Sequence, residues 1–249
     1  MNRFFILPEN ITEESVLLSE QQSHQIRNVL RLKSTDHIIV LDNCGFEYEA
    51  ELTDVNAKQV CACILDKRAI DSQTNLKLTV FQSMLARDKF EWVLQKCTEL
   101  GVHCIVPVIT RRSLVQKSGT VKSGKLQRWQ RILTEAAEQS ERAHIPVLDE
   151  ALGFDKALKR AMSLDLPMIA VCRADADALR TVLQGNLGKG VSSAGVFIGP
   201  EGGFDPCEIE MAVRAGLKPV HLGQRILRTE TAAVVFSALI MYESEGFYR

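Results

Sequence analysis

Two loops near the C-terminus combine glycines and charged residues in a pattern suited to binding a ligand. The first, Gly199-Pro200-Glu201-Gly202-Gly203, follows a short apolar run of the kind buried in sheets. Its glycines allow positive φ angles and close approach of the backbone to a ligand. It lacks the Gly-x-Gly-x-x-Gly spacing of dinucleotide-binding loops and the Gly-Lys-Ser/Thr of phosphate-binding loops. Taken alone, this loop is best interpreted as a tight turn between a strand and a helix.

The second loop, residues 222–232, places two arginines and a glutamate directly before an apolar helix. Arg225, Arg228 and Glu230 are interspersed with apolar residues there. Charged groups this close to a core cost free energy unless they are paired or bind a ligand. A solvated loop with an arginine–glutamate salt bridge explains the second loop equally well when it is considered by itself.

A basic segment precedes both loops. Between Arg111 and Arg131 the chain has seven basic residues and no Asp or Glu. Such segments contact phosphates and make nucleic-acid binding steeply dependent on salt, although a solvated run of charges is an equally frequent explanation. Trp129 shares helical spacing with Ile132 and Leu133, so we expect it in the core. The basic residues are Arg111, Arg112, Lys117, Lys122, Lys125, Arg128 and Arg131.

A second basic cluster, near the N-terminus, consists of His24, Arg27, Arg31 and Lys33. The spacing of Arg27 and Arg31 predicts that they share one face of a helix. His24 either stacks on a base or caps the helix, and neither role is catalytic. The remaining histidines lack the spacing of a metal site, so we expect no metal.

The elements that position these residues fall into two parts. The first 70 residues have the pattern of a small β-barrel with one helix at 23–32. Polar residues without periodicity at 66–75 predict a linker. We therefore expect one domain over residues 1–70 and a second over 71–249. The strands of the barrel are predicted at 4–7, 37–41, 48–55 and 59–65.

From residue 76 onward short apolar runs alternate with helical patterns, which is typical of an α/β domain with a parallel sheet. A helix at 206–215 is delimited by Asp205 as N-cap, Pro206 in the first turn, Glu208 three residues after the cap, and Gly216 as the stop. The strands are predicted at 76–82, 103–108, 168–172, 195–198 and 219–222, and the other helices at 88–100, 126–142, 176–183 and 231–242.

Composition excludes several classes of protein. The chain has 249 residues, of which 46% are hydrophobic and 24% charged, as in folded globular proteins. Its net charge of -1 excludes a uniformly basic nucleic-acid binder. The longest apolar run is too short to cross a membrane and the N-terminus does not resemble a signal peptide, so we expect a cytoplasmic protein. Its seven cysteines are expected to be reduced and mostly buried.

Considered together, the two loops resemble the C-terminal signatures of a known family. Residues 198–204 and 222–232 are similar to those of the bacterial 16S rRNA uridine N3-methyltransferases, which belong to the knotted SPOUT class and use S-adenosylmethionine. Ordered matches over nearly the whole chain are far more specific than one glycine loop. The further matching segments are residues 3–5, 24–32, 96–101, 111–113, 128–129 and 135–142.

This resemblance implies an α/β fold: a SPOUT-type C-terminal domain with a parallel sheet and a deep trefoil knot, plus a small N-terminal PUA-like β-barrel that binds RNA. The knot and the cofactor site would lie within about residues 168–245. The resemblance also implies a homodimer, S-adenosylmethionine as the cofactor, and 16S rRNA of the small ribosomal subunit as the partner. Methyl transfer of this kind requires no metal.

The resemblance also implies roles for individual residues. We hypothesise that Arg228 or Arg225 stabilises the uracil anion, and that Glu230 or Glu201 orients groups or accepts the proton. The alternative for Glu201 is that it holds its loop together by hydrogen bonds to backbone N–H groups. The cofactor-binding residues would be Val171, Cys172, Ile198, Gly199, Pro200, Glu201, Gly202, Leu222, Gly223, Ile226, Leu227 and Arg228. The RNA-binding residues would be Arg3, His24, Arg27, Arg31, Arg111, Arg112, Lys117, Lys122 and Lys125.

Two other functions remain as alternatives. One is a SPOUT methyltransferase that acts on tRNA or on a different base. The other is an RNA-binding ribosome-assembly factor that has kept the fold and lost catalysis. The presence of Glu201, Gly202, Arg228 and Glu230 argues against loss of catalysis.

Overall fold

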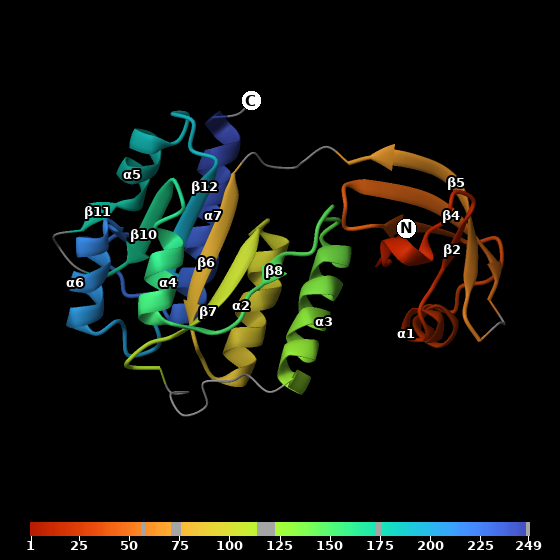
Figure 1. Cartoon of the computed structure of the whole chain (residues 1–249), viewed down its shortest axis with the longest axis horizontal. Coiled ribbons are helices and arrows are strands. Elements are labelled where there is room, and N and C mark those ends of the chain that lie inside the picture. Colours follow the sequence, from red (N-terminus) through yellow and green to blue (C-terminus); the bar gives the residue numbers. More distant parts are fainter. Residues whose placement is uncertain (56–57, 71–75, 114–122, 173–175, 248–249) are drawn as a thin grey trace. The chain divides into compact units, whose positions relative to one another are not determined.

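The structure is a computed structural model that describes residues 1–55, 58–70, 76–113, 123–172 and 176–247. Its contacts divide the chain into two units (Figure 1). The first unit consists of residues 1–73 together with 137–145, and the second of residues 74–136 together with 146–249. Two residues predicted to bind RNA, Lys117 and Lys122, lie outside the described residues.

Within the described residues, the first unit is built on a curled five-stranded sheet with the order β1-β3-β4-β5-β2. β1 runs parallel to β3, and the other neighbours are antiparallel. Side chains such as Phe4, Ile38 and Leu52 alternate toward one face and are fully buried there. The strands are β1 (Asn2–Phe5), β2 (Ser15–Leu17), β3 (His37–Leu41), β4 (Phe46–Asp54) and β5 (Cys61–Ala69).

The predicted linker at 66–75 begins too early. β5 continues to Ala69, and Asp66 to Ala69 pair with Glu49 to Phe46 of β4. Most of the second half of β5 is exposed, and three of these four residues are polar. Their side chains therefore show no pattern of burial from which a strand could be predicted. β2 was not predicted, because it is a three-residue edge strand with one buried side chain, Val16.

The one helical stretch of the first unit has two parts. After a one-turn 3₁₀ helix, η1 (Pro8–Asn10), α1 (Glu20–His24) begins at a capping box formed by Ser19 and Gln22. It continues as the π-helix η2 (Gln25–Leu30), which ends at Arg31 with a left-handed φ of 54°. The prediction that Arg27 and Arg31 share a helix face is therefore wrong, because Arg31 has already left the helix.

In the described residues, the second unit has an eight-stranded sheet with the order β11-β13-β10-β12-β6-β7-β8, in which β9 also pairs with β7. All pairs are parallel, as predicted. The strands are β6 (Lys77–Ser83), β7 (Cys104–Ile109), β8 (Val147–Leu148), β9 (Leu152–Gly153), β10 (Leu166–Ala170), β11 (Asp177–Ala178), β12 (Ser193–Ile198) and β13 (Lys218–His221).

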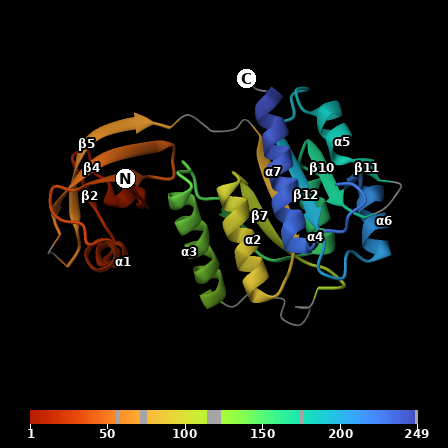
Figure 2. The same cartoon turned by 180° about the vertical axis from the view of Figure 1, so that it is seen from behind.

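Helices cover both faces of this sheet. α4 and α6 lie on one face (Figure 1), whereas α2 and α7 pack side by side on the other (Figure 2). Phe81 of β6 and Phe197 of β12 stack with ring centroids 4.3 Å apart, and Phe154 of α4 packs edge-on against Phe197. The helices are α2 (Arg87–Glu99), α3 (Ser123–Gln139), α4 (Phe154–Ala161), α5 (Leu179–Asn186), α6 (Pro206–Ala215) and α7 (Thr229–Phe247).

Trp129 is fully buried against Phe90, which confirms its predicted place in the core. The helix that carries it ends three residues earlier than predicted, since Glu141 has a φ of 57°.

The cysteines are free thiols, as expected, but only Cys97 and Cys104 are buried. The expectation of general burial is wrong because apolar neighbours in sequence do not bury a thiol: Cys63 points away from its neighbours along β5, Cys44 and Cys172 lie in loops, and Cys207 lies on an exposed face of α6. Cys44, Cys63, Cys172 and Cys207 are exposed.

Candidate functional site

A cavity of about 570 Å³ lies at the carboxyl ends of three adjacent parallel strands, β13, β10 and β12. Ligands bind at such positions in open α/β sheets. The structure places along this one cavity every residue that the sequence assigned to cofactor binding or catalysis. They are Val171, Cys172, Ile198, Gly199, Pro200, Glu201, Gly202, Leu222, Gly223, Arg225, Ile226, Leu227, Arg228 and Glu230.

The glycine loop after β12 is a tight turn held by its own backbone. The N–H of Gly203, a residue with a φ of 68°, donates to the carbonyl of Pro200 at 2.9 Å. A Cβ at Gly199 would lie 3.2 Å from the ring of Phe204, which packs beneath the loop. Asp205 then caps α6 with Glu208 in a capping box, as predicted. The loop therefore presents fixed backbone groups to the cavity.

The loop after β13 is joined to the glycine loop by buried hydrogen bonds. The hydroxyl of Thr229 donates to the carbonyl of Gly199. The side-chain amide of Gln82 donates to the same hydroxyl at 3.3 Å, from the carboxyl end of β6. Gln82 and Thr229 are both buried, so this chain of bonds sets the distance between the two loops.

The charged groups of the second loop are not paired with one another. Within the described residues, neither Arg225 nor Arg228 forms an ion pair with Glu230, so the proposed salt bridge of this loop is not observed. Both arginines are exposed at the cavity. The Oε2 atom of Glu230 is buried and has no hydrogen-bond partner among the described groups. A buried carboxylate oxygen of this kind requires a donor, and the cavity is where a ligand would supply one.

The other carboxylate at the cavity, Glu201, is already paired. Its Oε1 atom lies 3.1 Å from Nζ of Lys89, which is in the first turns of α2. The backbone hydrogen bonds considered for Glu201 are thus replaced by a salt bridge between two partly exposed groups. Sequence reasoning missed Lys89 because only the folding of the sheet brings α2 beside the glycine loop.

Arg111 and Arg112 contact the rim of the glycine loop. They lie in a turn after β7 that is closed by the buried hydroxyls of Thr110 and Ser113, 2.7 Å apart. Both guanidinium groups lie within 3.5 Å of the Asp205 carboxylate. The backbone N–H of Cys207 and these two arginines hold the pKa of Asp205 below its usual value, against the raising effect of desolvation.

Two further arginines of the basic segment are also opposed by acidic groups. Arg128 forms a bidentate salt bridge with Glu91, at 2.7 and 2.8 Å, and Arg131 pairs with Glu135. Lys125 lies 4.7 Å from the centroid of the Trp129 ring. The charges that are unopposed along the sequence are therefore partly neutralised in the fold.

In the first unit, Arg3 is held in place by acidic groups. Its guanidinium is 2.9 Å from Glu47 and also contacts Glu141. Burial would raise the pKa of Glu47, but the hydrogen bonds from Arg3 and Arg68 outweigh it and lower the pKa. Arg3 is thus mostly committed to a structural pair, whereas the side chains of His24 and Arg31 are exposed.

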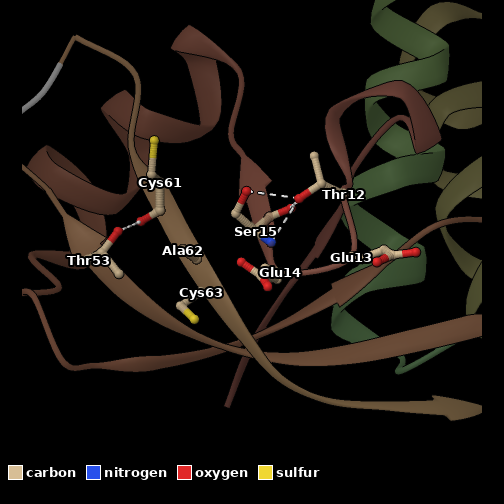
Figure 3. A pocket seen from close by; sticks show the side chains of 8 residues that line it. All are labelled: Thr12, Glu13, Glu14, Ser15, Thr53, Cys61, Ala62 and Cys63. Carbon is tan, nitrogen blue, oxygen red and sulfur yellow. Dashed lines mark hydrogen bonds between the residues drawn. The ribbon is translucent and has the colours of Figure 1, made fainter.

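A second hollow, of about 580 Å³, lies in the first unit between the turn before β2 and the first residues of β5 (Figure 3). Thr12 and Ser15 close that turn by hydrogen bonds, and the sulfur atoms of Cys61 and Cys63 point in different directions.

No group of three or more metal-ligating side chains occurs in the described part of the chain. None of the described helices combines the length and apolarity that a membrane crossing requires.

The chain matches known RNA methyltransferases over nearly its whole length. Residues 72–241 match the model of an RNA methyltransferase domain, and residues 18–65 match an RNA methyltransferase PUA domain. Ribosomal RNA small subunit methyltransferase E of Synechocystis sp. is 36% identical over 240 residues, 96% of this chain and 76% of the relative. The enzyme of that name from Bacillus subtilis is 33% identical over 252 residues, 98% of each chain.

Solved structures agree with this match. Ribosomal RNA small subunit methyltransferase E from Neisseria gonorrhoeae, bound to S-adenosylmethionine, superposes with a TM-score of 0.86 and 33% identity over 97% of both chains. A methyltransferase from Legionella pneumophila in complex with the same cofactor has a TM-score of 0.87 and 29% identity over 96% of both chains. The chain therefore belongs to the family of the ribosomal RNA small subunit methyltransferases E.

Proposed function

We propose that the protein transfers a methyl group from S-adenosylmethionine to N3 of a uridine in 16S rRNA of the small ribosomal subunit. The observation that carries the proposal is the cavity at the ends of β10, β12 and β13, where two loops with the family signatures meet. Relatives of the same family hold S-adenosylmethionine in their solved structures, which supports this choice of cofactor.

The residues of the cavity fit that cofactor. Its volume is within the range of small-molecule sites, and its walls combine aliphatic side chains with exposed backbone at the glycines. Val171, Ile198 and Leu227 would pack against the apolar parts of the cofactor, and the loop backbone at Gly199 and Gly202 lines the same cavity. When bound, S-adenosylmethionine supplies an electrophilic methyl group, so the protein must position and deprotonate the acceptor.

Glu230 is the better of the two candidate proton acceptors. The proton on N3 of uracil lies between two carbonyl groups and must leave before the nitrogen attacks. Glu230 has a buried oxygen without a partner at the cavity, whereas Glu201 is engaged by Lys89. Arg228 and Arg225 are positioned at the same cavity to stabilise the negative charge that develops on the ring, and Glu201 would orient the glycine loop.

The RNA would be held by both parts of the chain. We assign the RNA-binding role to residues 1–70 and the methyltransferase role to residues 71–249. His24, Arg27 and Arg31 in the first part, and Lys125 in the second, have side chains at least partly accessible to phosphate. The homodimer, the trefoil knot and the cytoplasmic location stay predictions.

Two experiments test this function. The first is mass spectrometry of 16S rRNA from cells with and without the gene: loss of one N3-methyluridine supports the proposal, and an unchanged set of modified uridines contradicts it. A change in another RNA would favour the alternative substrate. The second is calorimetry with S-adenosylmethionine, in which absence of binding would favour a non-catalytic assembly factor.

A further inference from the structure

The two adjacent arginines after β7 differ in how they contact the glycine loop. The turn that carries them is rigid, because the N–H of Ser113 donates to the carbonyl of Thr110 and their hydroxyls are bonded to each other. Arg111 binds the start of α6: its side chain is 3.3 Å from Asp205, and its backbone N–H donates to Glu208. Arg112 reaches further along the loop, to Gly202.

Arg112 holds both ends of the segment from Gly202 to Asp205. Its Nη1 donates to the carbonyl of Gly202 at 3.2 Å, and its Nη2 lies 3.5 Å from Asp205 Oδ2. The aliphatic stem covers Gly202, since a Cβ built there would lie 3.6 Å from Cβ of Arg112. The planar guanidinium has fixed donor directions that suit two acceptors at once, which an ammonium group on a lysine cannot match.

The bond to Gly202 fixes more than one atom. A peptide unit is planar, so the carbonyl of Gly202 and the N–H of Gly203 move together. That N–H donates to the carbonyl of Pro200 at 2.9 Å. The peptide is therefore held on one side by Arg112 and on the other by Pro200. Glycine has the widest conformational freedom of any residue. Removing one of these hydrogen bonds would therefore allow the two successive glycines to leave this conformation.

We propose that Arg112 is a positioning residue for the cofactor. It clamps the Gly202–Gly203 peptide in the conformation that lines the cavity. This inference rests on the proposed function, in which the cavity binds S-adenosylmethionine. Residues 199–203 all line the cavity, so a loop free to move would bind the cofactor only in a fraction of its conformations. Cofactor affinity falls in proportion to that fraction.

Calorimetry of the full chain with S-adenosylmethionine, without RNA, tests the proposal. Arg112→Ala should raise the Kd by about tenfold, the value of one charge-assisted hydrogen bond. Arg112→Lys keeps the charge and should recover only part of the affinity. Arg111→Ala removes the same charge from the neighbouring position and should leave the Kd within about twofold. With 16S rRNA also saturating, Arg112→Ala should raise KM for S-adenosylmethionine by a larger factor than it lowers kcat.

The outcomes separate this inference from the proposed function. Wild-type protein that fails to bind S-adenosylmethionine overturns both. Wild-type protein that binds it, with an unchanged Kd in Arg112→Ala, overturns the inference alone. Equal loss of cofactor affinity in Arg111→Ala and Arg112→Ala also overturns it, because charge rather than the bond to Gly202 would then be responsible. Thermal unfolding of each variant excludes a general loss of structure. If Arg112→Ala fails to fold, Arg112→Lys takes its place in the comparison.

Discussion

Thr229 donates a hydrogen bond to the carbonyl of Gly199, 30 positions earlier in the chain, and so joins the first residue of α7 to the loop after β12. The amide of Gln82, from a third element, donates to the same hydroxyl. One buried side chain therefore connects both loops of the cavity to β6, the strand beside β12.

Replacing Thr229 by valine should weaken the connection between the two loops of the cavity without changing the shape of the cavity. The variant removes the donor to the Gly199 carbonyl, and the Gln82 amide keeps only its hydrogen bond to the Ser83 carbonyl. Leaving a buried polar group unsatisfied costs about 1–3 kcal/mol. We expect a lower free energy of unfolding in urea and a higher Kd for S-adenosylmethionine. Thr229→Ser keeps the hydroxyl and is the matched control. Equal stability of Thr229→Val and wild type would show that this bond does not support the cavity.

Glu230→Gln and Glu201→Gln should differ in rate. Removal of a general base typically costs 10²- to 10⁴-fold, so we expect kcat of Glu230→Gln to fall by about 10²-fold or more. Glu201→Gln loses its charge pair with Lys89, an exposed pair of small value, and should lower kcat by less than about fivefold. Single-turnover methylation of 16S rRNA over a range of pH measures both. A rate for Glu230→Gln close to that of wild type would assign the proton to another group.

The thiols should fall into two classes of reactivity. Burial raises the pKa of Cys97 to about 12, so that thiol should not react with iodoacetamide at pH 8 in the folded protein. Cys44, Cys63, Cys172 and Cys207 are exposed and should react quickly. Cys172 lines the cavity, so S-adenosylmethionine should slow its alkylation and leave that of Cys44 unchanged. Peptide mass spectrometry identifies each site, and equal protection of both thiols would contradict the position of the cofactor.

Acid should weaken the first unit through Glu47. Its pKa is lower in the folded protein than in the unfolded chain, so the ionised form stabilises the fold at neutral pH. This contribution is fully present above the usual pKa of a glutamate and is lost as the pH falls through the lowered folded value. We expect Glu47→Gln to be less stable than wild type at pH 7 and the difference to shrink below pH 4.5. Urea titrations at several pH values measure it, and a difference independent of pH would exclude the charge pair.

The apolar strands and the helix caps could be predicted from the sequence because each depends on neighbouring residues. β3, for example, occupies the residues predicted for it, and α6 begins at the capping box read from Asp205 and Glu208. α4 was missed although Phe154, Ala157, Leu158 and Ala161 have helical spacing and are buried. Two-residue strands such as β8 and β9 are too short for any periodicity to appear.

The contacts of the charged residues could not be predicted, because they depend on the order of strands in the sheet. Lys89 meets Glu201 at a separation of 112 residues, and Arg128 meets Glu91 at a separation of 37. Charges that look unopposed along the chain are paired across it. The loops of the cavity were identified by their resemblance to the family signatures, since the residue types of each loop taken alone are equally consistent with a tight turn or a solvated salt bridge.

The strand order also determines when the cavity can form during synthesis. β6 pairs with β12, more than a hundred residues later, and β10 pairs with β13 near the end of the chain. Until β13 and the first turns of α7 have emerged from the ribosome, the cavity at the ends of β10 and β12 lacks the wall that these segments form. Such long-range pairings fold slowly. The protein therefore gains a complete ligand site only after β13 and the first turns of α7 have been synthesised, and fragments that end before β13 should not bind the cofactor.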